Sequence, residues 1–256
     1  MTVPRPTRPL GIVAHRGASA AAPENTVPAI ARAAAMGVRW VELDVALLGD
    51  GTAVLHHDAT LDRCTDRSGP LRSIGVQDLA GIDAGGWFDP AFAGERIPTL
   101  EIALDTVGTL DLAVNLELKP HGADPAPLAA AAVAALAARP ALAGRVTVSS
   151  FDHAALATLR ALATHLPVAP IYTRPSDWRA KAQTLGAEAI HARARDLDPA
   201  AVAEIAAAGL AVRCFTVNDP TAVAGLVEAG LDALFTDVPD RFLADPTWRA
   251  WDGARA

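Results

Sequence analysis

The chain has few cysteines and few aromatic residues. Its two cysteines, Cys64 and Cys214, are far apart and have no spacing typical of a metal site. A disulfide framework is therefore not expected. Aromatic residues make up 5% of the 256 residues, and alanine is the largest part of the 51% apolar fraction. This composition supplies a large core, excludes global disorder and favours closely packed helices.

The sequence also lacks a basic patch and a long apolar run. The formal net charge is −7, so binding to duplex nucleic acid is not expected. Alanine-rich runs such as residues 127–138 are too short to cross a bilayer, so no stable membrane insertion is expected. The chain begins with MTVPRPTRPLG, which predicts a loose N-terminal arm rather than a secretion signal. We therefore expect a soluble, cytoplasmic protein.

Short apolar segments alternate with helical segments along most of the chain. The expected strands are residues 11–14, 40–47, 113–118, 146–150, 168–172, 187–191, 211–217 and 233–236. The expected helices are residues 25–36, 126–138, 153–163, 178–185, 199–209, 220–230 and 239–243. Asn25 is placed to cap the first of these helices.

Eight strand-then-helix units of this kind predict a parallel sheet. Eight units in about 250 residues fit one closed (β/α)8 barrel of the TIM type, over residues 1–256. A doubly wound open sheet is the alternative. The first strand is not followed by a G-x-G-x-x-G motif, which disfavours a dinucleotide-binding fold.

An insertion at about residues 48–98 interrupts this alternation after the second strand. Near its start is Asp50-Gly51, a signal for a two-residue type I′ turn, so residues 53–57 should return antiparallel to the second strand. Gly49 would then lie opposite Thr52, and Asp44 opposite His57. The remainder should form a loop subdomain above the barrel mouth, where barrel enzymes determine substrate selectivity.

Charged residues occupy strand positions that should be apolar. Glu42 and Asp44 are two residues apart and share one face, which must point into the barrel because Val41, Leu43 and Val45 occupy the other. Glu117 and Lys119 repeat the arrangement on the next barrel strand.

Three inward carboxylates, Glu42, Asp44 and Glu117, repel one another unless a cation compensates. Oxygen ligands suit Mg²⁺ or Ca²⁺ better than zinc. The alternative is an internal ion pair with Lys119 and no metal.

Two histidines and an arginine are expected at the same mouth. His15 ends the first strand and Arg16 follows it, while the hairpin register gives His57, not His56, the face of the carboxylates. Two histidines can serve as a general acid and base. Arg16 and Lys119 supply positive charge for phosphate oxygens. The set fits phosphoryl transfer without a covalent nucleophile.

Several short motifs follow one another in an order that is specific as a set. They are Ala14-His15-Arg16-Gly17, Pro23-Glu24-Asn25-Thr26, Val41-Glu42-Leu43-Asp44-Val45, His57-Asp58, Leu61-Asp62-Arg63, Ile97-Pro98-Thr99-Leu100-Glu101, Leu116-Glu117-Leu118-Lys119, Ser149-Ser150-Phe151, Phe215-Thr216-Val217-Asn218 and Thr236-Asp237. With these motifs the chain resembles the glycerophosphodiester phosphodiesterase family from residue 11 to about residue 243.

The resemblance implies a (β/α)8 barrel with a small insertion after the second strand. It also implies hydrolysis of glycerophosphodiesters, such as glycerophosphocholine or glycerophosphoethanolamine, to glycerol 3-phosphate and an alcohol. The implied roles are acid/base catalysis for His15 and His57, binding of one divalent cation for Glu42, Asp44 and Glu117, and phosphate binding for Arg16 and Lys119.

Two further residues have assignments near the site. Phe215 stands where the family frequently has tryptophan, and it either forms an apolar wall beside the glycerol or belongs to the core. Glu24 is a candidate for holding the residues that contact the substrate, without contacting the substrate itself. The alternative activities are a lysophospholipase D or related phospholipid phosphodiesterase, and a non-catalytic binding barrel. The sequence selects no oligomeric state.

Overall fold

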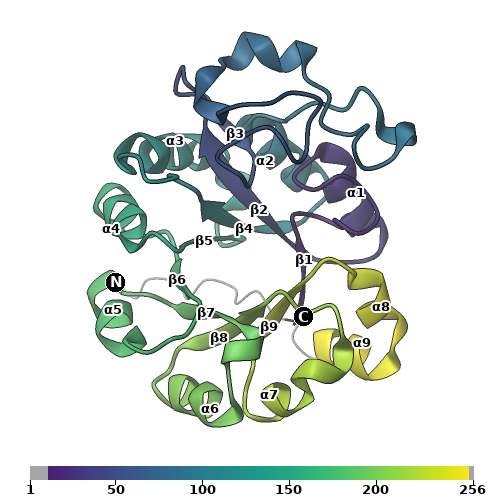
Figure 1. The fold of residues 1–256 in the computed structure, drawn as a ribbon. Coiled ribbons are helices and arrows are strands. Elements are labelled where there is room, and N and C mark those ends of the chain that lie inside the picture. Colours follow the sequence, from purple (N-terminus) through teal and green to yellow (C-terminus); the bar gives the residue numbers. More distant parts are fainter. Residues whose placement is uncertain (1–10, 254–256) are drawn as a thin grey trace.

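Eight parallel strands close into a barrel in the computed structural model, which describes residues 11–253 (Figure 1). The barrel strands are β1 (Gly11–His15), β2 (Trp40–Leu47), β4 (Ala113–Leu118), β5 (Val146–Ser150), β6 (Val168–Tyr172), β7 (Ala189–Arg193), β8 (Ala211–Phe215) and β9 (Ala233–Thr236). Because β1 pairs with both β9 and β2, the sheet is closed. The predicted barrel is confirmed and the open doubly wound sheet is excluded. The predicted N-terminal arm, residues 1–10, lies outside the described residues.

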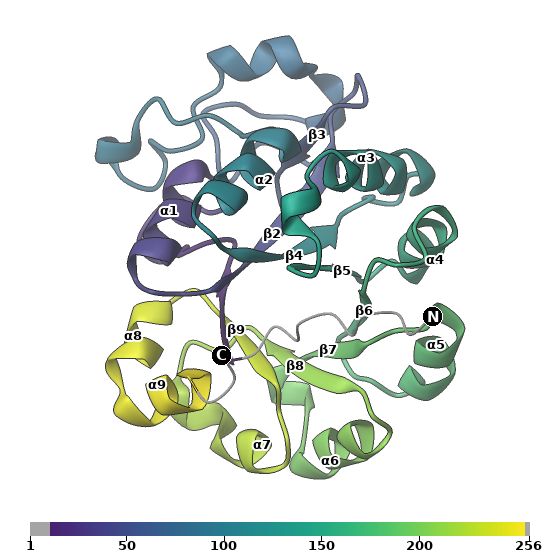
Figure 2. The same ribbon diagram turned by 180° about the vertical axis from the view of Figure 1, so that it is seen from behind.

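Helices cover the outside of the barrel (Figure 2). They are α1 (Val27–Ala35), α2 (Leu100–Thr109), α3 (Ala126–Ala137), α4 (His153–Leu162), α5 (Trp178–Leu185), α6 (Pro199–Ala207), α7 (Ala224–Glu228), α8 (Pro239–Ala244) and α9 (Pro246–Gly253). Helices α2 and α9 were not among the expected helices. Within residues 11–253, no helix combines the length and the apolar character needed to span a membrane.

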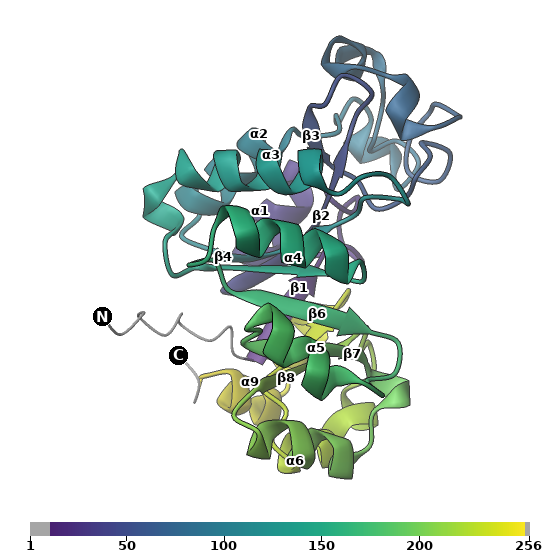
Figure 3. The same cartoon turned by 90° about the vertical axis from the view of Figure 1, so that its left-hand side faces the viewer.

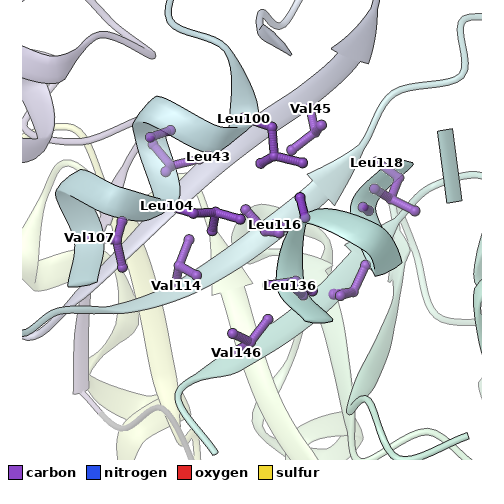
Figure 4. Close-up of a cluster of buried hydrophobic side chains, with 14 of the residues drawn as sticks. Leu43, Val45, Leu100, Leu104, Val107, Val114, Leu116, Leu118, Leu136 and Val146 are labelled. Carbon is purple, nitrogen blue, oxygen red and sulfur yellow. The ribbon is translucent and has the colours of Figure 1, made fainter. Parts of the chain in front are cut away.

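Strand alternation separates the packing face from the site face. Leu43 and Val45 of β2 point outward and belong to one buried cluster with Leu100 and Leu104 of α2 (Figure 4). Inside the barrel, Trp40 lies in a separate apolar cluster with side chains of β1, β4 and β9. The next inward positions on β2 are Glu42 and Asp44. One strand therefore supplies the barrel's apolar interior, its outer core and two carboxylates of the site.

The insertion after β2 has its own small core. It contains strand β3 (Ala53–Leu55) and three short 3-10 helices, η1 (Leu71–Ser73), η2 (Val76–Gly81) and η3 (Pro90–Phe92). Leu48, Val54, Leu61, Leu71 and Leu79 are among the buried residues that form this core. The subdomain lies beyond the C-terminal end of β2, at the same end of the barrel as the site (Figure 3).

The predicted hairpin register is wrong by one residue. Val45 pairs with Leu55, and Leu48 donates its backbone N–H to Thr52, so the turn has three residues, 49–51. Asp44 therefore lies opposite His56 and not opposite His57. The backbone N–H of His56 donates to the carbonyl oxygen of Asp44. Contacts with the insertion favour the longer turn, because Asp50 accepts from the backbone N–H of Val76 at 2.7 Å.

The turn that follows β1 depends on a glycine. Gly17 has a φ of +81°, and a Cβ there would lie 2.6 Å from the backbone carbon of Ala29 in α1. Gly51 also has a positive φ, +88°, but a Cβ there meets no described atom within 4 Å. The positive φ disfavours other residues at both positions, and of the two only position 17 would also bring a Cβ into a steric clash.

We expect Gly17→Ala to lower the free energy of unfolding by about 2–4 kcal/mol, because left-handed strain and overpacking add. Gly51→Ala, with strain alone, should cost about 1 kcal/mol. Urea denaturation of both variants measures the difference. Equal costs would show that α1 does not press against this turn.

Candidate active site

A cavity of about 420 Å³ opens at the C-terminal ends of the barrel strands. Most residues selected from the sequence line it, from five different strands or the loops after them: His15, Arg16, Glu42, His57, Glu117, Lys119 and Phe215. Asp44 lies behind this lining, beside Glu42 and Glu117. Glu24 contacts Arg16 from behind and is not part of the wall.

Three buried carboxylates form the group expected to hold a cation. Glu42, Asp44 and Glu117 each place one oxygen within 4.8 Å of the others. Oε1 of Glu42 and Oδ1 of Asp44 are buried and accept no hydrogen bond from the described residues. Burial raises the pKa of Glu42 well above its usual range, and the charges of Asp44 and Glu117 raise it further. Three clustered acids, two of which carry a buried oxygen that accepts no hydrogen bond from the described residues, fit a hard divalent cation.

Two cations partly neutralise this group. Nζ of Lys119 contacts Glu117 and lies 3.2 Å from Oδ1 of Asp44. Nε of Arg16 lies 3.1 Å from Oδ2 of Asp44. Burial alone would raise the pKa of Asp44, but Lys119 and Arg16 outweigh it and hold the pKa well below its usual range. The predicted alternative of internal ion pairing therefore accounts for Asp44, but within residues 11–253 no lysine or arginine side chain forms an ion pair with Glu42, and the nearest basic group given for it is Nε2 of His15, at 3.9 Å.

Arg16 is held by the geometry of the turn after β1. Its own φ is +58°, and its backbone N–H donates to Oε2 of Glu42 at 3.0 Å. Its Nη1 donates to Oε1 of Glu24 at 2.8 Å. With the contact to Asp44, the backbone and the side chain of one residue thus link three carboxylates, which fixes the guanidinium at the cavity wall.

An aspartate orients His15. Nδ1 of His15 donates to Oδ1 of Asp237 at 2.7 Å, and Nε2 lies 3.9 Å from Oε2 of Glu42. Burial alone would raise the pKa of Asp237, but the hydrogen bonds from His15, Asn218 and Ser19 lower it to about 2. Asp237 is therefore ionised at neutral pH, and the reactive Nε2 of His15 faces the carboxylates.

A second aspartate orients His57 in the same way. Nδ1 of His57 donates to Oδ1 of Asp58 at 2.5 Å, and Asp58 accepts from Nε of Arg63 at 2.6 Å. Arg63 also donates two hydrogen bonds to Glu24, which binds Arg16. A chain of charge-assisted hydrogen bonds thus runs from His57 through the insertion to Arg16.

The structure distinguishes the two adjacent histidines. His57 lines the cavity, whereas His56 is buried behind it and shares a hydrogen bond through Nε2 with the carbonyl of Thr60, at 2.8 Å. Strand β3 ends at Leu55, so the ladder does not set the orientation of His57. The choice of His57 agrees with this placement, although the register used to reach it is wrong.

Asn25 is not the helix cap that the sequence suggested. The cap of α1 is Thr26, whose side chain accepts from the N–H of Ala29. Asn25 has a φ of +56°, donates to Oδ2 of Asp44 at 2.8 Å and accepts from the N–H of Asp44 at 3.0 Å. It holds Asp44 in place, and local helix signals could not indicate that contact.

Two aromatic rings form an apolar wall of the cavity. Phe215, at the end of β8, meets Phe151 edge-on with ring centroids 5.7 Å apart. Nζ of Lys119 lies 5.8 Å from the centroid of Phe151. Phe215 and Phe151 both line the cavity near Lys119, and Phe215 also packs against the apolar cluster inside the barrel.

Comparisons with known proteins agree with the site. Residues 15–241 match the model of the Glycerophosphoryl diester phosphodiesterase family. A glycerophosphodiester phosphodiesterase of Caldanaerobacter subterraneus is 32% identical, over 91% of this chain and 96% of its own. One from Bacillus altitudinis is 30% identical, over 90% and 95%.

A solved structure of a similar protein has the same fold. The Oleispira antarctica phosphodiesterase, solved with its product sn-glycerol-3-phosphate, superposes with a TM-score of 0.86. It is 33% identical, and the match covers 91% of this chain and 95% of that one.

Proposed function

Because the chain belongs to the glycerophosphoryl diester phosphodiesterase family, we propose that this phosphodiesterase hydrolyses glycerophosphodiesters to glycerol 3-phosphate and an alcohol with the help of one divalent cation. Glycerophosphocholine and glycerophosphoethanolamine are the expected substrates. The observation that carries the proposal is the pair of aspartate-held histidines, His15 and His57, beside three buried carboxylates in one cavity. The product bound to the Oleispira antarctica relative supports the same reaction.

Glu42, Asp44 and Glu117 would hold the cation, Mg²⁺ or Ca²⁺. When all three acids are ionised, they and the two basic residues Arg16 and Lys119 leave one negative charge at this end of the cavity, which would repel a phosphodiester. When bound, the cation reverses that sign and stabilises negative charge on the phosphate oxygens. Arg16 and Lys119 line the cavity and would bind the same oxygens.

The two histidines divide the proton transfers. Burial lowers the pKa of His57, so its imidazole is neutral at pH 7 and able to accept a proton. We infer that Nε2 of His57 removes the proton from the attacking oxygen. Attack by water gives glycerol 3-phosphate directly, whereas attack by the glycerol 2-hydroxyl gives a cyclic phosphate, which water must then open. His15, between Asp237 and Glu42, then protonates the leaving alcohol. Each Nδ1 is held by an aspartate, so each Nε2 stays directed at the substrate.

Release of glycerol 3-phosphate, followed with a coupled dehydrogenase, tests the proposal. Glycerophosphocholine and glycerophosphoethanolamine are supplied with Mg²⁺, Ca²⁺ or EDTA, and lysophosphatidylcholine is tested in parallel for choline release. Release from the glycerophosphodiesters that EDTA abolishes supports the proposal. Choline release from the lysolipid alone would make the protein a lysophospholipase D, and no turnover of any substrate would favour the binding barrel.

Asp237 acts through His15 and is a positioning residue. We expect Asp237→Asn to lower kcat by about tenfold to a hundredfold with little change in KM, because the amide no longer fixes the tautomer of His15. Ser19→Ala, which removes a different hydrogen bond to Asp237, is the matched control and should stay within about threefold. A rise in KM with unchanged kcat would instead assign Asp237 to substrate binding.

A further inference from the structure

Two arginines line the cavity on the side away from the carboxylates. Arg193 ends β7 and Arg195 follows it. In the order of strands around the closed barrel, β7 lies four places from β2, which is directly across the mouth. Glu42 and Asp44 come from β2 and Glu117 from the adjacent β4. The cavity thus has an acidic end, where the cation and the phosphate would bind, and a separate basic end.

The basic end is not neutralised by the residues around it. The nearest acid is Asp196, at 3.8 Å from Nη1 of Arg193 and 3.9 Å from Nε of Arg195. Arg174 approaches the same carboxylate at 3.8 Å. These separations are too long for hydrogen bonds, although the Asp196 side chain is only 20% exposed. Three arginines around one aspartate leave two positive charges.

Neither guanidinium at the cavity has a hydrogen-bond partner within residues 11–253. The side chain of Arg193 is 34% exposed and that of Arg195 is 76% exposed, so both can reach a bound molecule. The carboxylates that line the cavity, Glu42 and Glu117, both lie at the opposite end. No described acid in the wall is therefore placed beside these arginines to receive an ammonium group.

The aromatic wall connects the two ends. Phe151 lies beside Lys119, and Phe215 pairs in register with Arg193 on the adjacent strand. Because the two rings touch edge-on, they form a continuous apolar surface between Lys119 and Arg193. With the phosphate at Lys119 and the glycerol beside His57 at the acidic end, the alcohol part rather than the glycerol would lie along these rings, with its far end at the arginines.

We propose that the preferred substrate carries an anionic group, a carboxylate or a phosphate, on its alcohol part, and that Arg193 and Arg195 bind it. The proposal rests on the proposed function and names its substrate class. The planar fork of an arginine matches a carboxylate or phosphate with two parallel hydrogen bonds. A choline or ethanolamine head group would instead bring its positive charge toward two like charges.

Glycerophosphoserine and glycerophosphoethanolamine form a matched pair of probes, because they differ by one carboxylate. We expect the wild-type kcat/KM to be about tenfold higher for glycerophosphoserine, because its carboxylate can make a charge-assisted contact with the arginines that glycerophosphoethanolamine cannot make. Arg193→Gln and Arg195→Gln should each reduce this ratio, and the double variant should bring it close to 1. The preference should also decline as KCl is added, since the arginines are exposed.

Arg32→Gln is the control, because it removes one positive charge from an exposed position in the last turn of α1, on the outside of the barrel. It should keep the full ratio. An active wild type with a ratio of 1 or less would overturn this proposal and leave the proposed function intact. If the double variant kept the full ratio, the proposal would also be overturned, because the preference would then not come from the arginines. No turnover of either probe or of glycerophosphocholine would instead reject the proposed function itself.

Discussion

His57→Ala should lower kcat/KM for glycerophosphoethanolamine by about a hundredfold or more, whereas His56→Ala should lower it by no more than about threefold. The first removes a proton-transfer group from the cavity, and such groups contribute about 10²–10⁴ in rate. The second removes a side chain that lies behind the cavity and contacts the carbonyl of Thr60. His15→Ala should match the loss seen for His57→Ala.

The two adjacent histidines make this comparison sharp, because they are the same residue type and neighbours in the loop that follows β3. Circular dichroism and thermal melting of both variants separate a loss of fold from a loss of chemistry, since His56 is buried. An inactive His56→Ala beside an active His57→Ala would mean that the cavity wall is assigned to the wrong residue.

Glu42→Gln should have two effects of opposite sign. It should lower activity by about a hundredfold or more, because one of three cation ligands loses its charge. It should also raise the melting temperature of the metal-free enzyme at pH 8. The pKa of Glu42 is raised in the folded protein, so its charged form destabilises the fold, and stability is lost as the pH rises through that raised pKa.

Calorimetric titration with Mg²⁺ or Ca²⁺ and melting curves with and without EDTA measure both effects. The wild type should gain stability when the cation binds, and Glu42→Gln should gain little. Glu228→Gln, at an exposed position on α7, removes one negative charge elsewhere and should behave like the wild type. A metal-free Glu42→Gln that melts below the wild type would show that Glu42 is an ordinary ion-pair partner rather than an uncompensated acid.

The fold followed closely from local patterns. Short apolar strands, helix caps and glycines recur often enough to set eight units, and strand alternation alone turns Glu42, Asp44 and Glu117 inward. Those features depend on neighbouring residues. The hairpin register depended on a contact between Asp50 and Val76, across the insertion, and the two-residue turn signal therefore gave the wrong pairing.

The supporting residues of the site were harder to predict because their partners are distant in sequence. His15 and Asp237 are 222 positions apart, and closure of the barrel brings their strands together. Asn25 looked like a cap because the helix signal beside it is strong, yet its side chain holds Asp44 on the next strand. The basic end formed by Arg193 and Arg195 could not be predicted from neighbouring residues, because its position opposite the carboxylates depends on which strands face each other across the barrel.

Phosphorus NMR of glycerophosphoethanolamine incubated with the enzyme tests the central claim most directly. With Mg²⁺ or Ca²⁺ present, the account predicts that the substrate resonance is replaced by that of glycerol 3-phosphate, and that EDTA or His57→Ala prevents this. Appearance of phosphoethanolamine would contradict it, because the phosphate would then have stayed with the alcohol and the other ester bond would have been broken. Conversion that continues unchanged in EDTA would contradict the assignment of Glu42, Asp44 and Glu117 to a catalytic cation.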